Sequence, residues 1–289
     1  MKLYTYWRSQ ASFRVRIALR LKGLVAETTS LDLLKGGQFD PSYRMLNPEM
    51  VVPTLLDGDG PPLVQSLAIL EYLEEKYPQS PILPVDLRAR AHVRGLAQML
   101  AMDAHPFIVP RVRKYLEQEL HLDEPARMKW LRHWLDGGSR AVEDVLARDP
   151  RTGCFCYGDR PTIADICLVA HLTSAKMLCD RDAAPYPTAR RILDACMQIE
   201  AFALEHPLRQ PGAQNDGARL SLDDLAVLIS VREAQPALQS FRHARNVMTR
   251  SSSLWLDHQI SLRKPLRSCS SLASIAVCIR KAPGSCVHR

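Results

Sequence analysis

The chain has 289 residues, 46% of them hydrophobic and 24% charged, and it contains no run of about 18 apolar residues, the length that a membrane span requires. This composition excludes a disordered chain and a membrane-spanning one. The net charge of +7 is unevenly distributed, because residues 215–289 carry 11 Lys+Arg and 5 Asp+Glu, whereas residues 1–214 carry 27 and 26. The charge therefore does not favour nucleic acid as a partner of the first 214 residues. The opening residues 1–7 lack a signal-peptide core, so we expect a cytoplasmic protein.

The first 80 residues alternate between patterns typical of strands and of helices. Ser12 and Ser66 each stand before an amphipathic run and are candidate N-caps of two helices, the first of which ends near Gly23. Strand, helix, strand predicts a parallel crossover, and a Gly-Asp-Gly turn predicts an antiparallel hairpin at one edge. The expected strands cover residues 2–7, 26–32, 51–57 and 63–65.

Pro53 does not fit the interior of its strand, because proline cannot donate to a β ladder. We therefore expect the start of this strand to bind a ligand, and a cis peptide bond before Pro53 would suit this role.

Residues 78–84 contain three prolines and are expected to form a linker. All later elements are predicted to be helical. The sequence from Thr162 to Asp165 is a capping box, which fixes one helix start. The helices are expected near 87–119, 124–148, 162–180 and 188–203.

The cysteines contain no CxxC pair and no partner pair at zinc spacing, so we expect no metal site. In a cytoplasmic chain the five cysteines before residue 214 are expected to be reduced thiols.

At this point the residues resemble a known family. The segment YWRSQASFRVRIAL at 6–19 is similar to the signature of zeta-class glutathione transferases, the class of maleylacetoacetate and maleylpyruvate isomerases. Further matching landmarks are Val52-Pro53, Gln65-Ser66, His105-Pro106, Thr162–Asp165 and Pro185–Pro187. The resemblance covers about residues 1–214. It implies an α/β plus all-α protein, with a thioredoxin-like glutathione-binding domain over 1–80 and an all-helical substrate domain over 87–212.

The chemistry of the first helix start can be argued from the residues. Ser9 and Ser12 lie where a strand turns into a helix, and free amides with the helix dipole favour an anion there. A thiol at this point loses its proton more easily, and a serine hydroxyl can donate to the thiolate. The resemblance implies that the thiol is that of glutathione and that Ser9 is the catalytic donor, with Ser12 also in the cofactor site.

The remaining cofactor contacts are implied by the resemblance. Gln65 and Ser66 open a second helix and would hold the γ-glutamyl carboxylate, Val52 before Pro53 would bond the cysteinyl part, and Gln38 would reach the glycyl end. His105 would donate to glutathione, or it packs at a kink. Ser12 and Ser66 could each be only a helix cap.

The reaction implied by the resemblance is the cis-trans isomerisation of a maleyl keto acid. A thiolate adds to the double bond, the resulting single bond rotates, and the thiolate leaves, so glutathione is a recycled cofactor. The substrate is a dicarboxylate, so cationic side chains should hold it. Arg8 is the first candidate, as a catalytic and substrate-binding residue, and Arg111 is the second. Arg8 could also be a surface ion-pair residue, and Arg111 part of a solvated helix face.

Three departures from the family pattern bear on this interpretation. Gln10 and Ala11 stand where zeta enzymes often carry Ser-Cys, a departure that favours the bacterial maleylpyruvate type. Apolar residues 107–109 replace the asparagines that the family tends to have after His-Pro. The family places a substrate-binding arginine where this chain has Met177. Lys176 is a candidate replacement, but one residue along a helix is about 100° of rotation, so the two side chains should not point the same way.

The basic, serine-rich tail at 213–289 has no counterpart in the resemblance. We expect it to be disordered, either as an extension without evolved structure or as a basic arm for nucleic acid or a membrane. Because no binding motif in it is complete, we expect neither partner.

Three functions remain open: the isomerase, a general glutathione transferase that conjugates electrophiles, and a non-catalytic transferase-like scaffold. Homodimerisation is expected by analogy with the fold.

Overall fold

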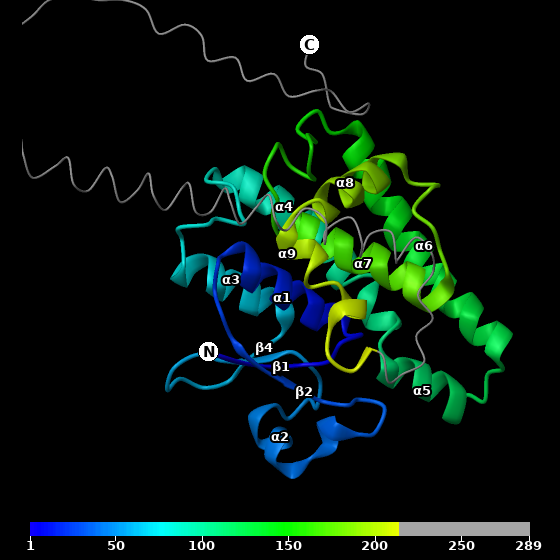
Figure 1. Ribbon diagram of the computed structural model, residues 1–289. Coiled ribbons are helices and arrows are strands. Elements are labelled where there is room, and N and C mark those ends of the chain that lie inside the picture. The colour runs from blue at the N-terminus through cyan, green and yellow to red at the C-terminus, as the bar shows by residue number, and fades with distance from the viewer. Residues whose placement is uncertain (214–289) are drawn as a thin grey trace, which may run out of the picture. The chain divides into compact units, whose positions relative to one another are not determined.

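The structure is a computed structural model, and it describes residues 1–213. The first 80 residues form a four-stranded mixed sheet in the order β2-β1-β3-β4, with α1 and α3 on one face and α2 on the other (Figure 1). This is the thioredoxin-like arrangement predicted from the sequence. Its elements are β1 (Lys2–Thr5), α1 (Gln10–Leu21), β2 (Glu27–Ser30), η1 (Gly37–Phe39), α2 (Pro41–Leu46), β3 (Thr54–Leu56), β4 (Leu63–Val64) and α3 (Ser66–Lys76).

The strand pairing confirms both expected connections. β1 pairs with β2 in parallel, with Lys2 opposite Glu27, and with β3 in antiparallel. β3 and β4 form the antiparallel hairpin at the edge. β3 begins only at Thr54, so Pro53 precedes the strand, and the Val52–Pro53 peptide is cis, as the sequence suggested.

The caps of α1 differ from those predicted. Ser9, not Ser12, is the N-cap, and its side chain accepts a hydrogen bond from the N–H of Ser12. Ser12 is therefore already the third residue of the helix. At the other end Lys22 is the C-cap, and Gly23 follows it with a φ of 67°, a left-handed conformation that glycine adopts without a steric penalty.

The rest of the described chain is helical, as predicted, but the helices are more divided. The expected helix over 87–119 is broken by a 3-10 turn at His105-Pro106, and the one over 188–203 is broken near Ile199. The elements are α4 (Leu87–Ala101), η2 (His105–Phe107), α5 (Pro110–Gln118), α6 (Glu124–Arg148), α7 (Ile163–Cys179), α8 (Pro187–Met197), α9 (Glu200–Ala203) and η3 (Pro207–Arg209).

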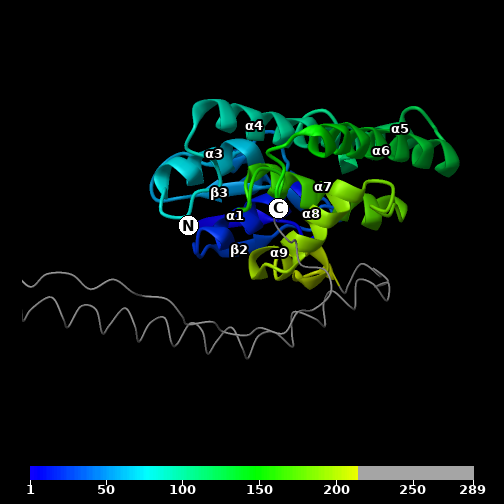
Figure 2. The ribbon, with the colours of Figure 1, turned by 90° about the horizontal axis from the view of Figure 1, so that it is seen from above.

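The central element is α7, which packs against α1, α4, α6 and α8 (Figure 2). Most of its residues are buried, and the predicted capping box is present at its start. The buried carboxylate of Asp165 accepts hydrogen bonds from the N–H and the Oγ1 of Thr162, at 2.7 and 2.8 Å, and from the N–H of Cys156 at 2.7 Å. The capping box thus also holds the loop before α7.

The proline-rich linker over residues 78–84 is held by a buried ion pair. The Nζ of Lys22 lies 2.8 Å from a carboxylate oxygen of Glu74, and their side chains are 0% and 6% exposed. Both groups also bond the backbone around the linker: Lys22 donates to the carbonyls of Tyr77 and Ser80, and Glu74 accepts from the N–H groups of Ile82 and Leu83. The linker is therefore fixed to α1 and α3.

Among residues 1–213 no helix combines the length and the hydropathy needed to cross a bilayer. The predicted tail at 213–289 lies outside the described residues except for Ala213, which is buried.

Candidate functional site

Ser9 stands at the N-terminus of α1, directly after the β1 loop. Its Oγ accepts a hydrogen bond from the N–H of Ser12 at 3.2 Å. This bond uses a lone pair of the oxygen and leaves the O–H proton as a donor. The hydroxyl also lies at the positive end of the helix dipole, where an anion is stabilised. The geometry therefore suits a donor to an anionic sulfur.

Ser12 does not occupy the N-cap position predicted for it. It is 0% exposed, and its Oγ has no hydrogen-bond partner among residues 1–213. The N–H of Ser12 orients Ser9, and a contact of the Ser12 side chain with the cofactor stays a prediction.

The start of α3 forms a second polar cluster. Gln65, not Ser66, is the N-cap of this helix, and its φ of 68° lies in the left-handed region, where non-glycine residues are uncommon and often functional. Its side-chain amide donates to the carboxylate of Glu49 at 2.9 Å. Ser66 is the first helical residue, and its Oγ accepts from the Nε of Arg14 at 3.1 Å.

Arg14 links this cluster to the helical region. Arg14 is 2% exposed, and its Nη2 lies 3.4 Å from the Nδ1 of His105. Because arginine only donates, the Nδ1 accepts, and the proton of the neutral imidazole is on Nε2. Burial, and next the positive charge of Arg14, hold the pKa of His105 well below its usual value. His105 is therefore neutral, with one N–H to donate.

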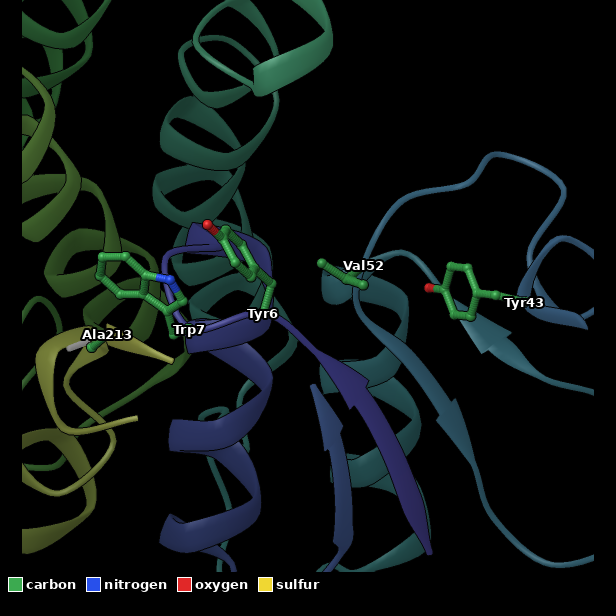
Figure 3. Packing of buried hydrophobic residues seen from close by; sticks show 5 residues of the cluster. All are labelled: Tyr6, Trp7, Tyr43, Val52 and Ala213. Carbon is green, nitrogen blue, oxygen red and sulfur yellow. The ribbon is translucent and has the colours of Figure 1, made fainter. Parts of the chain in front are cut away.

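Val52 and Gln38 lie in two further segments of the first 80 residues. Val52 precedes β3, and its backbone takes no part in the loop hydrogen bonds of residues 1–213. Figure 3 shows its side chain facing Tyr6. Gln38 lies in η1, and its Oε1 is buried without a partner in the same part of the chain. The backbone of Val52 and the amide of Gln38 thus retain hydrogen-bonding capacity.

A cluster of buried apolar residues forms the floor of this region. Tyr6 and Trp7 extend from the end of β1, and Trp7 lies beside Ala213 (Figure 3). Met177 of α7 packs against this cluster, whereas Lys176 makes an ion pair with Asp180 at 2.6 Å. The two neighbours on α7 therefore point in different directions, as their position on the helix predicts.

The arginines considered for the substrate come from two segments, the residue before Ser9 and helix α5. Arg8 is half-buried, and its guanidinium carbon lies 6.0 Å from the centre of the Trp7 ring. Arg111 and Arg113 both lie on α5, but Arg111 is exposed and Arg113 is half-buried. Burial, and next the charge of Arg8, lower the pKa of Arg113.

Sequence reasoning missed the position of Arg14 between Ser66 and His105. A charged residue between Phe13 and Val15, in the most apolar part of α1, was the available signal for Arg14. No comparable signal predicted that Arg113 is half-buried and Arg111 exposed, because the face that α5 buries depends on its packing.

The arrangement places the hydroxyl of Ser9 at a helix N-terminus, directly after Arg8 in the chain. Such a site can hold a thiolate at Ser9, a carboxylate at the start of α3, and a further anion at Arg8.

Residues 3–81 match the family "Glutathione S-transferase, N-terminal domain". The chain is 41% identical over 211 residues to a maleylpyruvate isomerase of Ralstonia sp., a match that covers 73% of this chain and 99% of that protein. It is also similar to the crystal structure of a maleylacetoacetate isomerase from Methylobacterium extorquens AM1 with bound malonate and glutathione, with 46% identity, a TM-score of 0.72, and coverage of 74% and 99%.

A third similar structure is the holo form of a maleylpyruvate isomerase, described as a bacterial glutathione S-transferase of the zeta class. It shares 40% identity with this chain at a TM-score of 0.71, over 74% of this chain and all of that one.

Proposed function

This chain belongs to the maleylacetoacetate and maleylpyruvate isomerase family of zeta-class glutathione transferases, and we propose that it is a glutathione-dependent cis-trans isomerase of a maleyl keto acid. The position of Ser9 at the N-terminus of α1, next to Arg8, is the observation that carries the proposal. Ser9 binds the thiol of glutathione and Arg8 binds the substrate, so the nucleophile and the electrophile are brought together.

Ser9 stabilises the thiolate of glutathione. Its oxygen is held by the N–H of Ser12, so its O–H donates to the sulfur, and the dipole of α1 favours the negative charge. The thiolate adds to the cis double bond, the new single bond rotates, and elimination returns the thiolate and the trans product. The cycle consumes no further reactant, because the thiolate that adds is the thiolate that leaves.

The rest of glutathione contacts η1, the segment before β3 and the start of α3. Gln65 and Ser66 hold the γ-glutamyl carboxylate, and the backbone of Val52, fixed by Pro53, bonds the cysteinyl part. Gln38 reaches the glycyl end, and the Nε2–H of His105 donates from the helical region. The free hydrogen-bonding capacity of Val52 and Gln38 supports these roles.

Cations hold the carboxylates of the substrate and stabilise the enolate that forms when sulfur adds. Arg8 does so next to Ser9, and Arg111 from α5. Lys176 is less suited to this task, because its ammonium must leave the ion pair with Asp180 before it can reach a substrate.

We also propose a cytoplasmic homodimer. The fold supports this by analogy, since its two domains usually pair across a two-fold axis. Analytical ultracentrifugation of the full chain tests the dimer, and a monomer at micromolar concentration would contradict it.

The decisive experiment follows the loss of maleylpyruvate and of maleylacetoacetate with and without glutathione. Glutathione-dependent formation of the trans isomer, with glutathione returned unchanged, is the expected result. Conjugation of a chlorinated aromatic without any isomerisation would establish the general transferase instead. No binding of glutathione in a calorimeter would leave only the scaffold. The same assay on a chain that ends after Ala213 tests the tail, and equal rates are expected.

A further inference from the structure

Gln65 and Ser66, the neighbouring residues at the start of α3, each hydrogen-bond a charged side chain, and the two charges are opposite. The Nε2 of Gln65 donates to the carboxylate of Glu49 at 2.9 Å. The Oγ of Ser66 accepts from the guanidinium of Arg14 at 3.1 Å. A negative group beside one residue and a positive group beside the next are complementary to a ligand that carries an ammonium and a carboxylate on one carbon.

The carboxylate of such a ligand fits the N-terminus of α3. Within the described part of the chain the side chain of Gln65 makes no cap hydrogen bond, whereas Asp86 and Thr162 cap α4 and α7 with theirs. The first N–H groups of α3 therefore keep their capacity to donate. The helix dipole and the charge of Arg14 both favour an anion at this point.

Glu49 and Gln65 offer acceptor oxygens to the other end of the ligand. A carboxylate cannot donate, so the amide nitrogen of Gln65 faces Glu49 and the Oε1 remains an acceptor. Glu49 makes no ion pair with a cation of residues 1–213, and both residues are exposed and thus open to a ligand. An ammonium has three N–H donors and no acceptor, so it is the group that these oxygens suit.

The backbone of Glu49 is held in place although its side chain is exposed. Its N–H donates to the Oδ1 of Asn47 at 3.1 Å, and Asn47 is only 1% exposed. The Nδ2 of the same buried amide donates to the carbonyl of Val51 at 2.8 Å and to the Oγ1 of Thr54 at 3.2 Å. The loop before β3 is therefore anchored, and it places the carboxylate beside Gln65.

We propose that Glu49 is a glutathione-binding residue, which takes the α-ammonium of the γ-glutamyl group together with the Oε1 of Gln65. This assignment rests on the proposed function, in which Gln65 and Ser66 hold the carboxylate on the same carbon. The start of α3 thereby selects a thiol with a zwitterionic γ-glutamyl end over one that ends in a carboxylate alone.

The test compares two ligands in the full-length protein by calorimetry. One is glutathione, and the other is glutaryl-cysteinyl-glycine, which lacks the ammonium and keeps every other group. We expect the natural chain to bind glutathione at least about fivefold more tightly than the analogue. Glu49→Gln should weaken glutathione by about fivefold and change the affinity for the analogue by less than about twofold. This double comparison isolates the contact between Glu49 and the ammonium.

A matched variant makes the result specific to this position. Glu75→Gln removes one negative charge from an exposed position of the same helix α3, and we expect it to change the affinity for glutathione by less than about twofold. The thermal unfolding midpoint of each variant shows that it is folded.

Equal weakening of both ligands in Glu49→Gln would overturn the proposal, and so would equal binding of both ligands by the natural chain or an equal loss in Glu75→Gln. If the chain prefers glutathione through Glu49 but does not isomerise maleyl acids, the proposed function fails and this assignment stands. If it isomerises them with glutathione and Glu49→Gln keeps the natural preference, the function stands and this assignment fails.

Discussion

The Nε of Arg14 donates a hydrogen bond of 3.1 Å to the Oγ of Ser66, and only 2% and 6% of the two residues are exposed. The same guanidinium contacts the Nδ1 of His105. One buried charge on α1 thus positions a residue at the start of α3 and another in the helical region. Both of its partners are proposed to touch glutathione, so Arg14 sets their relative position.

Replacing Arg14 by Met should therefore weaken glutathione binding by about tenfold, because Ser66 and His105 lose a shared charged donor. The pKa of His105 should also rise, since the positive charge that disfavours its protonation is gone. Calorimetry measures the first effect and an NMR titration of the imidazole the second. Ser66→Ala is the control, which should weaken glutathione binding but leave the His105 pKa in place. An unchanged His105 pKa in Arg14→Met would refute the link.

Ser9→Ala should reduce kcat by about 10²- to 10³-fold, as the loss of one preorganised donor to a developing or resident anion does in other enzymes. The pKa of bound glutathione should rise toward about 8.5, the value of a free cysteine thiol. Thiolate absorbance against pH measures this shift. Loss of the N-cap also costs about 1 kcal/mol of stability, so folding is checked at the assay temperature. A normal thiolate titration in Ser9→Ala would assign the stabilising group elsewhere.

Acid should destabilise the fold through His171 on α7. Its Nε2–H donates to the carbonyl of Leu135 at 3.0 Å, and its Nδ1 is buried without a partner among residues 1–213. Burial lowers its pKa to about 4, so the unfolded chain, with a histidine pKa near 6.5, takes up the proton first. Stability is therefore present above about pH 6.5 and is lost as the pH falls toward about 4, by about 3 kcal/mol.

Urea unfolding at several pH values measures this loss in the natural chain and in His171→Gln. The glutamine variant should show a shallower dependence on pH, because His105 titrates in both proteins and only His171 differs. Equal slopes would show that His171 is not the group responsible.

Two adjacent glycines in α6 should respond oppositely to alanine. A Cβ on Gly138 would lie 2.9 Å from the Cβ of Ala104 and 3.1 Å from the ring of His171, closer than packed atoms permit. A Cβ on Gly137 would meet nothing within 4 Å. We expect Gly138→Ala to destabilise by about 1–3 kcal/mol through overpacking. Gly137→Ala should stabilise by about 0.5–1 kcal/mol through helix propensity. Chemical denaturation compares them, and a stabilising Gly138→Ala would contradict the packing.

The order of strands and helices could be predicted because each element carries its own periodicity and caps. The capping box at Thr162 is a local pattern, and the structure confirms it. The local sequence could not decide whether Ser9 or Ser12 is the N-cap of α1, because both serines precede the same amphipathic run and either can cap it. The backbone turns into the helix at Gln10, so Ser9 is the cap and Ser12 is buried.

The residues of the candidate site also divide into those whose place the sequence predicts and those whose place depends on packing. Arg8 and Ser9 follow a strand and open a helix, so their place could be inferred from chain order alone. The different directions of Lys176 and Met177 were also predicted, from helix geometry, and their contacts confirm them. Arg111 and Arg113 are two residues apart, which is about 200° around a helix, and they differ in exposure: Arg111 is exposed and Arg113 is half-buried. How α5 packs decides this difference, and no pattern within α5 predicts it.

The pairing of Lys22 with Glu74 has a consequence for how the chain can be divided. The proline-rich segment looks like the natural place to separate the two halves, yet Glu74 accepts from Ile82 and Leu83 beyond it. A chain cut at residue 80 would leave this buried carboxylate without two of its donors. Recombination between related genes that joined the halves at this point would preserve the fold only where the ammonium, the carboxylate and the backbone course through Leu83 are inherited together.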